Sequence, residues 1–209
     1  MASQHILAGG LSGLVEITCT HPLDYMKVSL QQNKKIVFKE FYRGILSRYT
    51  SVFPMRSILW GCRNTGVRIL KNRNIIEKGS AIGSTAGVLQ TFVDAPLENI
   101  KIQQMYNNKV DYSPKNLIRG FTPNMARNII LCCGIITGCL VDDKVGLLAG
   151  SAIGCLLSQP FDYIKTMRQT GIEGEYKNMM RGWQYRIAIT PLNMLIGYNI
   201  YKWLIVDEN

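Results

Sequence analysis

Three segments of the chain share one pattern of residues that could do chemistry. Each has a proline, an acidic residue two positions later and a lysine three positions after the acid. A proline inside a helix removes a backbone hydrogen bond and kinks the axis, which would turn the following charges toward a common centre. Three acids and three lysines could then close a ring of ion pairs. The segments are His21-Pro22-Leu23-Asp24-Tyr25-Met26-Lys27, Ala95-Pro96-Leu97-Glu98-Asn99-Ile100-Lys101 and Gln159-Pro160-Phe161-Asp162-Tyr163-Ile164-Lys165.

Such a ring suits a gate better than a catalytic centre, because all of its pairs can break together when the helix ends move apart. Each charge at membrane depth costs roughly 2.5–3.5 kcal/mol, which pairing across helices would offset. Gln31 and Gln169 lie four residues after the lysines of the first and third segments and could brace the ring by hydrogen bonds. The alternative is three local ion pairs that face water.

An Arg-Gly pair follows each segment, with its glycine 22 or 24 residues after the proline. If each pair begins the next helix, the free N–H groups and the helix dipole favour a bound phosphate, and a lipid phosphate is the natural occupant. The alternative is a simple turn glycine beside an arginine that extends along the surface. The pairs are Arg43-Gly44, Arg119-Gly120 and Arg181-Gly182.

Because both motifs recur in the same order, the sequence predicts three tandem repeats, over residues 1–76, 77–143 and 144–209. The prolines are 74 and 64 residues apart, which leaves room for two helices and a connection in each repeat. The predicted fold is an all-α membrane protein with six transmembrane helices in three pseudo-symmetric two-helix repeats. The expected helices cover residues 5–31, 46–69, 79–105, 121–141, 145–169 and 184–204.

The apolar runs of the chain are each shorter than the roughly 20 residues of a clean membrane span. They cover residues 80–93, 128–141, 145–161 and 187–201, and the mean hydropathy of the chain is only +0.04. Small residues at four-residue spacing, such as Gly146, Gly150 and Gly154, would let helices approach closely in lipid. The connections at 32–43, 106–119 and 170–181 are the more basic ones, and we expect them on one side of the membrane.

These motifs resemble the mitochondrial carrier family, whose repeat signature is Pro-x-[Asp/Glu]-x-x-[Lys/Arg] followed by an aromatic-basic-Gly box. The resemblance covers nearly the whole chain. It implies a central cavity, a matrix-side salt-bridge gate, cardiolipin at the glycine-containing helix ends, and a monomer that crosses the mitochondrial inner membrane several times. It also implies an internal targeting signal without a cleaved presequence. The implied gate pairs are Asp24–Lys101, Glu98–Lys165 and Asp162–Lys27.

The first third of the chain looks most like the oxodicarboxylate carriers. Family contact positions fall on Arg127 and Asn128 in the second repeat and on Ser51 in the first, with Arg186 one turn before the position in the third. A planar guanidinium suits a carboxylate, so the resemblance implies a substrate chamber of these residues and Glu16. The implied function is exchange (antiport) of small anionic metabolites by alternating access, with 2-oxoglutarate or 2-oxoadipate as the best match. The alternative role for Arg127 is an internal ion pair with Glu16.

The chain also departs from the family. It is much shorter than typical members, and Asn64 and Asn199 stand where a second salt-bridge network on the opposite side needs acids. We therefore expect a weak or apolar gate there. Two alternative functions stay open: a nucleotide carrier for ATP, ADP or dNTP, including a virus-encoded one, and a degenerate homologue that no longer transports.

Composition argues against other classes of protein. A chain with 47% hydrophobic and 18% charged residues does not fit the signature of disorder. The six cysteines form no CxxC motif and there are two histidines, so we expect no disulfide framework, metal site or cofactor. The net charge of +10 could serve nucleic acid, but the basic residues recur at repeat positions instead of gathering on one face. The sequence offers no catalytic nucleophile with a base, so neither an enzyme nor a nucleic-acid partner is expected.

Overall fold

The computed structural model describes residues 2–31, 41–42, 45–106, 112–170, 180 and 183–206. The described part is helical and contains no strand. Its helices are α1 (Ala2–Gln31), α2 (Ile45–Ile69), α3 (Ile75–Tyr106), α4 (Pro114–Leu117), α5 (Phe121–Val141), α6 (Val145–Thr170) and α7 (Trp183–Val206). The six long helices agree with the predicted spans to within four residues at each end.

The short helix α4 was not predicted, and it lies within the expected connection over residues 106–119. Ser113 has an extended backbone and precedes Pro114, whose fixed φ and missing N–H suit the first position of a helix. The amide of Leu117 donates to the Ser113 carbonyl (3.0 Å). One helical turn therefore forms where the sequence suggested only a loop.

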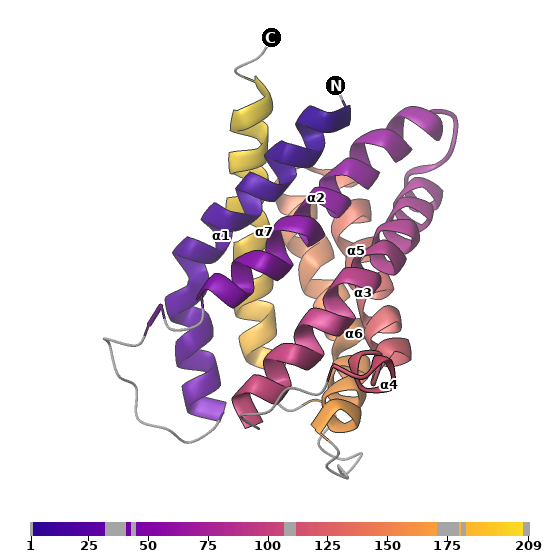
Figure 1. Cartoon of the computed structure of the whole chain (residues 1–209). Coiled ribbons are helices and arrows are strands. Elements are labelled where there is room, and N and C mark those ends of the chain that lie inside the picture. The colour runs from indigo at the N-terminus through magenta and orange to yellow at the C-terminus, as the bar shows by residue number, and fades with distance from the viewer. Residues whose placement is uncertain are drawn as a thin grey trace.

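The long helices surround a common centre (Figure 1). Helix α1 packs against α2 and α7, α3 packs against α2 and α5, and α6 packs against α5 and α7, which closes the ring. The chain ends and the short connections α2–α3 and α5–α6 lie together, at what we call the terminal end. At the opposite end, which we call the basic-loop end, α1, α3 and α6 end and α2, α5 and α7 begin.

The long helices expose many apolar side chains and bury many polar ones beside the apolar core. In α1, Leu11 and Val15 are exposed, whereas Ser12 and Glu16 are buried. In α6, Leu157 is 62% exposed while the adjacent Ser158 is fully buried. This distribution is the reverse of that in a water-soluble protein, and it is expected for a bundle with lipid around it.

By length and apolar composition alone, one stretch of the described residues, Pro114–Val141, is suited to cross a membrane. Polar side chains interrupt the apolar character of the other long helices, as Glu16 does in α1. Because those side chains point inward, they lower the average hydropathy of the helix without meeting the surroundings. This explains why the apolar runs of the sequence are short.

Glycines let the helices of the bundle approach backbone to backbone. A Cβ atom added at Gly138 of α5 would lie 2.1 Å from the Gly146 carbonyl oxygen of α6, and one at Gly150 would lie 2.2 Å from the Gly134 oxygen. Helix α3 uses Gly83 in the same way against the backbone of Cys133. The small residues that the sequence marked at four-residue spacing are therefore contact points between helices.

We predict that Gly138→Ala destabilises the fold, because the atom that the new methyl group meets belongs to the backbone and cannot turn aside. Overpacking of this kind costs about 1–3 kcal/mol, or several degrees in thermal unfolding temperature. Gly61→Ala in α2 is the matched control, since its methyl group would meet only the side chain of Ile6, at 3.1 Å. Thermal unfolding in detergent checks both variants, and equal losses would contradict the packing argument.

The apolar core occupies the half of the bundle toward the terminal end. Trp60 of α2 stacks on Tyr201 of α7 with ring centroids 4.8 Å apart and contacts Tyr198 at 5.3 Å. Leu59, Ile135 and Ile136 pack in the same cluster and are fully buried. The polar part of the interior therefore lies between this core and the basic-loop end.

Candidate functional site

A cavity of about 280 Å³ lies inside the ring of helices. Its lining includes four arginines and two carboxylates, and two of the arginines also pair with acids outside the lining, Arg56 with Glu16 and Arg127 with Asp94. The charged lining residues are Arg48, Arg56, Arg127, Arg186, Glu98 and Asp162. The remaining lining residues are Met55, Leu59, Gln90, Asn128, Leu131, Cys132, Ile135, Ile189, Thr190 and Asn193.

Arg127 of α5 forms ion pairs with two acids, Asp94 and Asp162. Its Nη2 donates to Asp94 Oδ2 (2.9 Å) and its Nη1 donates to Asp162 Oδ1 (3.1 Å). Its Nε also donates to Asn128 Oδ1 (3.1 Å), which fixes the plane of the guanidinium. Arg127 is therefore internally paired, as the alternative role expected, but the expected partner is wrong: Arg127 pairs with Asp94 and Asp162, and Glu16 pairs with Arg56.

Two charged partners in this network, Asp94 and Arg56, were missed by the sequence reasoning. Asp94 is buried and also accepts a hydrogen bond from Asn124 Nδ2 (3.0 Å). Arg56 Nε donates to Glu16 Oε2 (2.8 Å) across α1 and α2. Both are charges within otherwise apolar stretches, Phe92-Val93-Asp94-Ala95 and Phe53-Pro54-Met55-Arg56. A single charge within an apolar stretch was the signal in the sequence that could have identified both residues.

The other predicted substrate residues have separate positions. Arg186 lines the cavity, donates to Gln159 Oε1 (2.9 Å) and lies 3.5 Å from Asp162 Oδ2. Ser51 donates to the Arg48 carbonyl (3.0 Å). Neither Ser51 nor Glu16 is among the lining residues of the described cavity. Arg127, Asn128 and Arg186 are therefore the predicted residues that the structure brings together.

At the basic-loop side of the cavity, Lys165 of α6 contacts Glu98 Oε2 of α3. This contact joins the two residues that the resemblance paired. The Lys165 side chain is almost fully buried, and its Nζ also lies 4.0 Å from Asp162 Oδ1. The side chains of Asp24, Lys27, Gln31, Lys101 and Gln169 lie outside the described part of the chain, so the ring is described over one of its three expected pairs.

Of the three Arg-Gly pairs, only Arg119-Gly120 is described, and Arg43, Gly44, Arg181 and Gly182 lie outside the described residues. Gly120 precedes α5 with φ 76°, a left-handed conformation that favours glycine. The amide of Phe121 donates to the Ile118 carbonyl (3.0 Å) and Pro123 has no N–H, so few amides of this first turn are left for a phosphate. Arg119 itself is exposed.

At the terminal end, the structure has a charged cluster where the sequence predicted a weak or apolar gate. Asp143, in the α5–α6 connection, accepts a hydrogen bond from the Tyr198 hydroxyl (2.5 Å) and contacts Lys202 Nζ. Arg63 Nη2 lies 3.8 Å from the same carboxylate and over the Tyr198 ring. We call these four residues the Asp143 cluster. This end is therefore not apolar, and its acid was missed because it comes from a connection and not from an even helix.

The two acids of the α5–α6 connection are both held in their charged form. Burial alone would raise the pKa of Asp143, but hydrogen bonds from Lys202 and Tyr198 outweigh it and lower the pKa below the ordinary 3.8. Backbone amides of Lys144 (2.9 Å) and Val145 (2.6 Å) donate to Asp142 and lower its pKa as well. Asp142 thereby caps the start of α6.

We predict that Asp143→Asn weakens the contacts that hold the α5–α6 connection to α2 and α7 at the terminal end, and so lowers the thermal unfolding temperature. Loss of a half-exposed charged hydrogen bond costs about 1 kcal/mol, or roughly 2–4 °C in thermal unfolding temperature. Because the native pKa is depressed, the stabilisation is complete above pH 3.8 and is lost only as pH falls through the lower native value. The difference between wild type and variant should therefore stay constant from pH 8 to pH 5.

Glu77→Gln is the control for this variant, since Glu77 is an exposed acid at the same end, 3.6 Å from Arg73. It should change the unfolding temperature by less than a degree. A difference between wild type and Asp143→Asn that disappears between pH 8 and pH 6 would mean that another group holds Lys202 in place.

Comparisons with known proteins point to the mitochondrial carriers. Residues 2–37, which include the first motif, match the family described as mitochondrial carrier protein. A probable mitochondrial 2-oxodicarboxylate carrier of Schizosaccharomyces pombe is 26% identical over 88% of this chain and 79% of its own. The chain is a homologue of the mitochondrial carriers.

Two further relatives match this carrier homologue over most of its length. Mitochondrial 2-oxodicarboxylate carrier 2 of Saccharomyces cerevisiae is 25% identical over 78% of the chain and 73% of that protein. Mitochondrial magnesium exporter 1 of Drosophila melanogaster is 23% identical over 84% of the chain and 79% of that protein. The predicted resemblance to mitochondrial carriers, with similarity to oxodicarboxylate carriers, is confirmed. The relatives' names do not agree on a single substrate.

Proposed function

We propose that this carrier homologue exchanges small anionic metabolites across the mitochondrial inner membrane by alternating access. The observation that carries the proposal is the cavity lined by four arginines and two carboxylates. Ion pairs lie on both sides of it, Glu98 with Lys165 toward the basic-loop end and the Asp143 cluster at the terminal end. A charged cavity between two clusters that can break in turn is the arrangement that alternating access needs.

We further propose 2-oxodicarboxylates as the substrates. Two carboxylates could bind Arg127 and Arg186, because each guanidinium offers a planar pair of donors. The cavity volume of about 280 Å³ has room for a compact dicarboxylate. The names of two relatives point the same way. The four arginines of the lining argue against a magnesium ion, although one relative is named an exporter of it.

The shared position of Asp162 suggests how substrate and gate are coupled. Asp162 is within ion-pair distance of Arg127, Arg186 and Lys165. A substrate anion that binds the guanidiniums of Arg127 and Arg186 would displace the Asp162 carboxylate from both. The released Asp162 carboxylate would then compete with Glu98 for Lys165. The Glu98–Lys165 ion pair would therefore weaken only when substrate is bound.

The three-repeat organisation, over residues 1–76, 77–143 and 144–209, is also a proposal. It is supported by the equivalent positions of Pro22, Pro96 and Pro160 inside α1, α3 and α6. We propose a monomer, since the cavity is complete within one chain. Cardiolipin at the Arg-Gly helix ends remains a proposal, and Arg119→Gln should reduce the thermal stabilisation by cardiolipin if Arg119 binds its phosphate.

The experiment is exchange in liposomes that contain the purified chain. Vesicles loaded with 2-oxoglutarate should take up external labelled 2-oxoglutarate and 2-oxoadipate, and empty vesicles should not. Parallel vesicles loaded with citrate, ADP or Mg²⁺ test the alternatives. Uptake of ADP without 2-oxoacids would establish the nucleotide carrier, and absence of exchange with every substrate from a folded protein would favour the degenerate homologue.

A further inference from the structure

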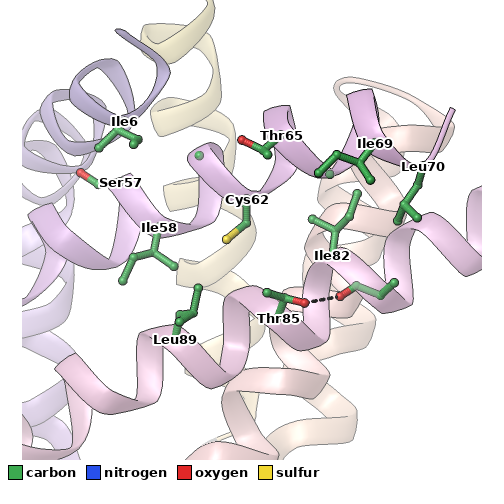
Figure 2. A pocket seen from close by; sticks show the side chains of 13 residues that line it. Ile6, Ser57, Ile58, Cys62, Thr65, Ile69, Leu70, Ile82, Thr85 and Leu89 are labelled. Atoms are coloured by element: carbon green, nitrogen blue, oxygen red, sulfur yellow. Dashed lines mark hydrogen bonds between the residues drawn. The ribbon is translucent and has the colours of Figure 1, made fainter. Parts of the chain in front are cut away.

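A second hollow of the molecule, separate from the central cavity, lies between α2 and α3 (Figure 2). Its volume is about 520 Å³, and it shares no lining residue with the central cavity. Side chains of α2 and α3 point toward one another across it, and Ile6 of α1 lies at one edge. We call it the α2–α3 groove.

The surface of the groove is apolar. Nine of its thirteen lining residues are aliphatic or glycine, so it offers little to a polar ligand. The Thr85 hydroxyl is satisfied within its own helix, where it donates to the Ala81 carbonyl (2.9 Å). Gly66 of α2 lets the Ile82 side chain of α3 pack against its backbone, since a Cβ atom at Gly66 would lie 2.4 Å from Ile82.

The groove opens outward, away from the central cavity. Three of its large apolar lining residues are exposed: Ile6 at 45%, Leu89 at 46% and Ile69 at 74%. In a chain that spans a membrane, this side of the bundle faces lipid. An apolar hollow at such a surface would be filled by an acyl chain, because water gains no hydrogen bonds there.

Basic residues stand at the terminal end of the groove. The segment 68–78 contains Arg68, Lys71, Arg73 and Lys78 against the single acid Glu77, and Ile69 and Leu70 of the same segment line the groove. A cluster of this kind at a membrane surface attracts anionic headgroups. From Ile69 to Ser57 the groove follows twelve residues of α2, about 18 Å at 1.5 Å per residue.

We propose that the α2–α3 groove binds an anionic phospholipid, with one acyl chain between α2 and α3 and the phosphate at the basic segment 68–78. A second copy of this chain is a poorer occupant, since a symmetric contact through this face would bring two basic segments together. The site lies at the end of the bundle opposite to Arg119-Gly120, the Arg-Gly pair that the structure describes. The inference rests on the chain spanning a membrane, and it does not depend on which substrate is carried.

The test is photo-crosslinking of the purified full chain with a phosphatidylglycerol that carries a diazirine in one acyl chain. Peptide mapping should place the label within residues 57–70 and 81–89. Unlabelled phosphatidylglycerol should compete at least tenfold better than phosphatidylcholine with the same chains. Ala81→Phe should reduce labelling at least fivefold by filling the groove, while Ala149→Phe, at an exposed alanine of α6, should leave it unchanged.

The headgroup contact is tested by Lys71→Gln with Lys78→Gln, which should remove the preference for phosphatidylglycerol. Lys115→Gln with Lys144→Gln removes the same charge at exposed positions away from the groove and should keep the preference. Equal competition by phosphatidylcholine in the wild type, better competition by free palmitate, or labels confined to other helices would each overturn the proposal. Because wild-type binding is measured directly, a chain that binds lipid here without exchanging oxoacids separates this inference from the proposed function.

Discussion

Arg127→Lys should lower the initial rate of 2-oxoglutarate exchange about 10- to 100-fold and leave the fold in place. The guanidinium donates to Asp94, Asp162 and Asn128 at the same time. A lysine keeps the charge but cannot present two parallel donors to a carboxylate. Loss of one charge-assisted hydrogen bond to the substrate is worth about 1.5–3 kcal/mol, which corresponds to that range of rates.

Arg168→Lys is the matched control for this variant, because Arg168 is exposed near the end of α6. It should exchange at the wild-type rate. Thermal unfolding of Arg127→Lys within a few degrees of wild type would show that the loss is one of substrate binding. Unchanged 2-oxoglutarate uptake in a correctly folded Arg127→Lys protein would contradict the assignment of Arg127 to the substrate.

Lys165→Glu should abolish exchange and destabilise the chain by about 3–5 kcal/mol. The Lys165 side chain is almost fully buried against Glu98, with Asp162 nearby, so the substitution would leave three carboxylates facing one another. The double variant Glu98→Lys with Lys165→Glu restores one pair of opposite charge. It should recover a measurable part of both stability and exchange.

Charge reversal by itself is controlled with Lys115→Glu, an exposed position of α4 at the same end of the bundle. Exchange in this control should remain within about twofold of wild type, as expected for surface charges. If the double variant is folded but no more active than Lys165→Glu alone, the pair would serve stability and not gating.

The helices of this chain were predictable because their causes are local or repeated. Apolar runs, the recurring proline motif and the spacing of glycines placed all six long helices. The Glu98–Lys165 contact also follows the implied pattern, in which the acid of one motif pairs with the lysine of the next. Pro114 was visible in the sequence, yet one turn of helix in a connection leaves no periodicity to detect.

The partners of individual charges were harder to predict, because they depend on how helices distant in sequence face one another. Arg56 and Glu16 are 40 residues apart, and Tyr198 and Asp143 are 55 apart. The comparison with the family directed attention to acids within even helices. It therefore overlooked Asp143, whose effect arises from the position of a three-residue connection at the end of the bundle.

The backbone contact between α5 and α6 determines which parts of the chain can move separately. Gly134, Gly138, Gly146 and Gly150 leave no side chains at the contact that could change rotamer, so these helices cannot slide past each other without a clash. The same argument joins α3 to α5, because Gly83 and Gly87 meet the backbones of Cys133 and Ile129. We expect α3, α5 and α6 to move as one rigid body, with Asp143 at its tip. Since α5 and α6 lie on either side of residue 143, this body crosses the boundary between the second and third proposed repeats. Opening at the terminal end would then be asymmetric, with α3, α5 and α6 moving together away from α2 and α7, which hold Asp143 through Arg63 and Lys202.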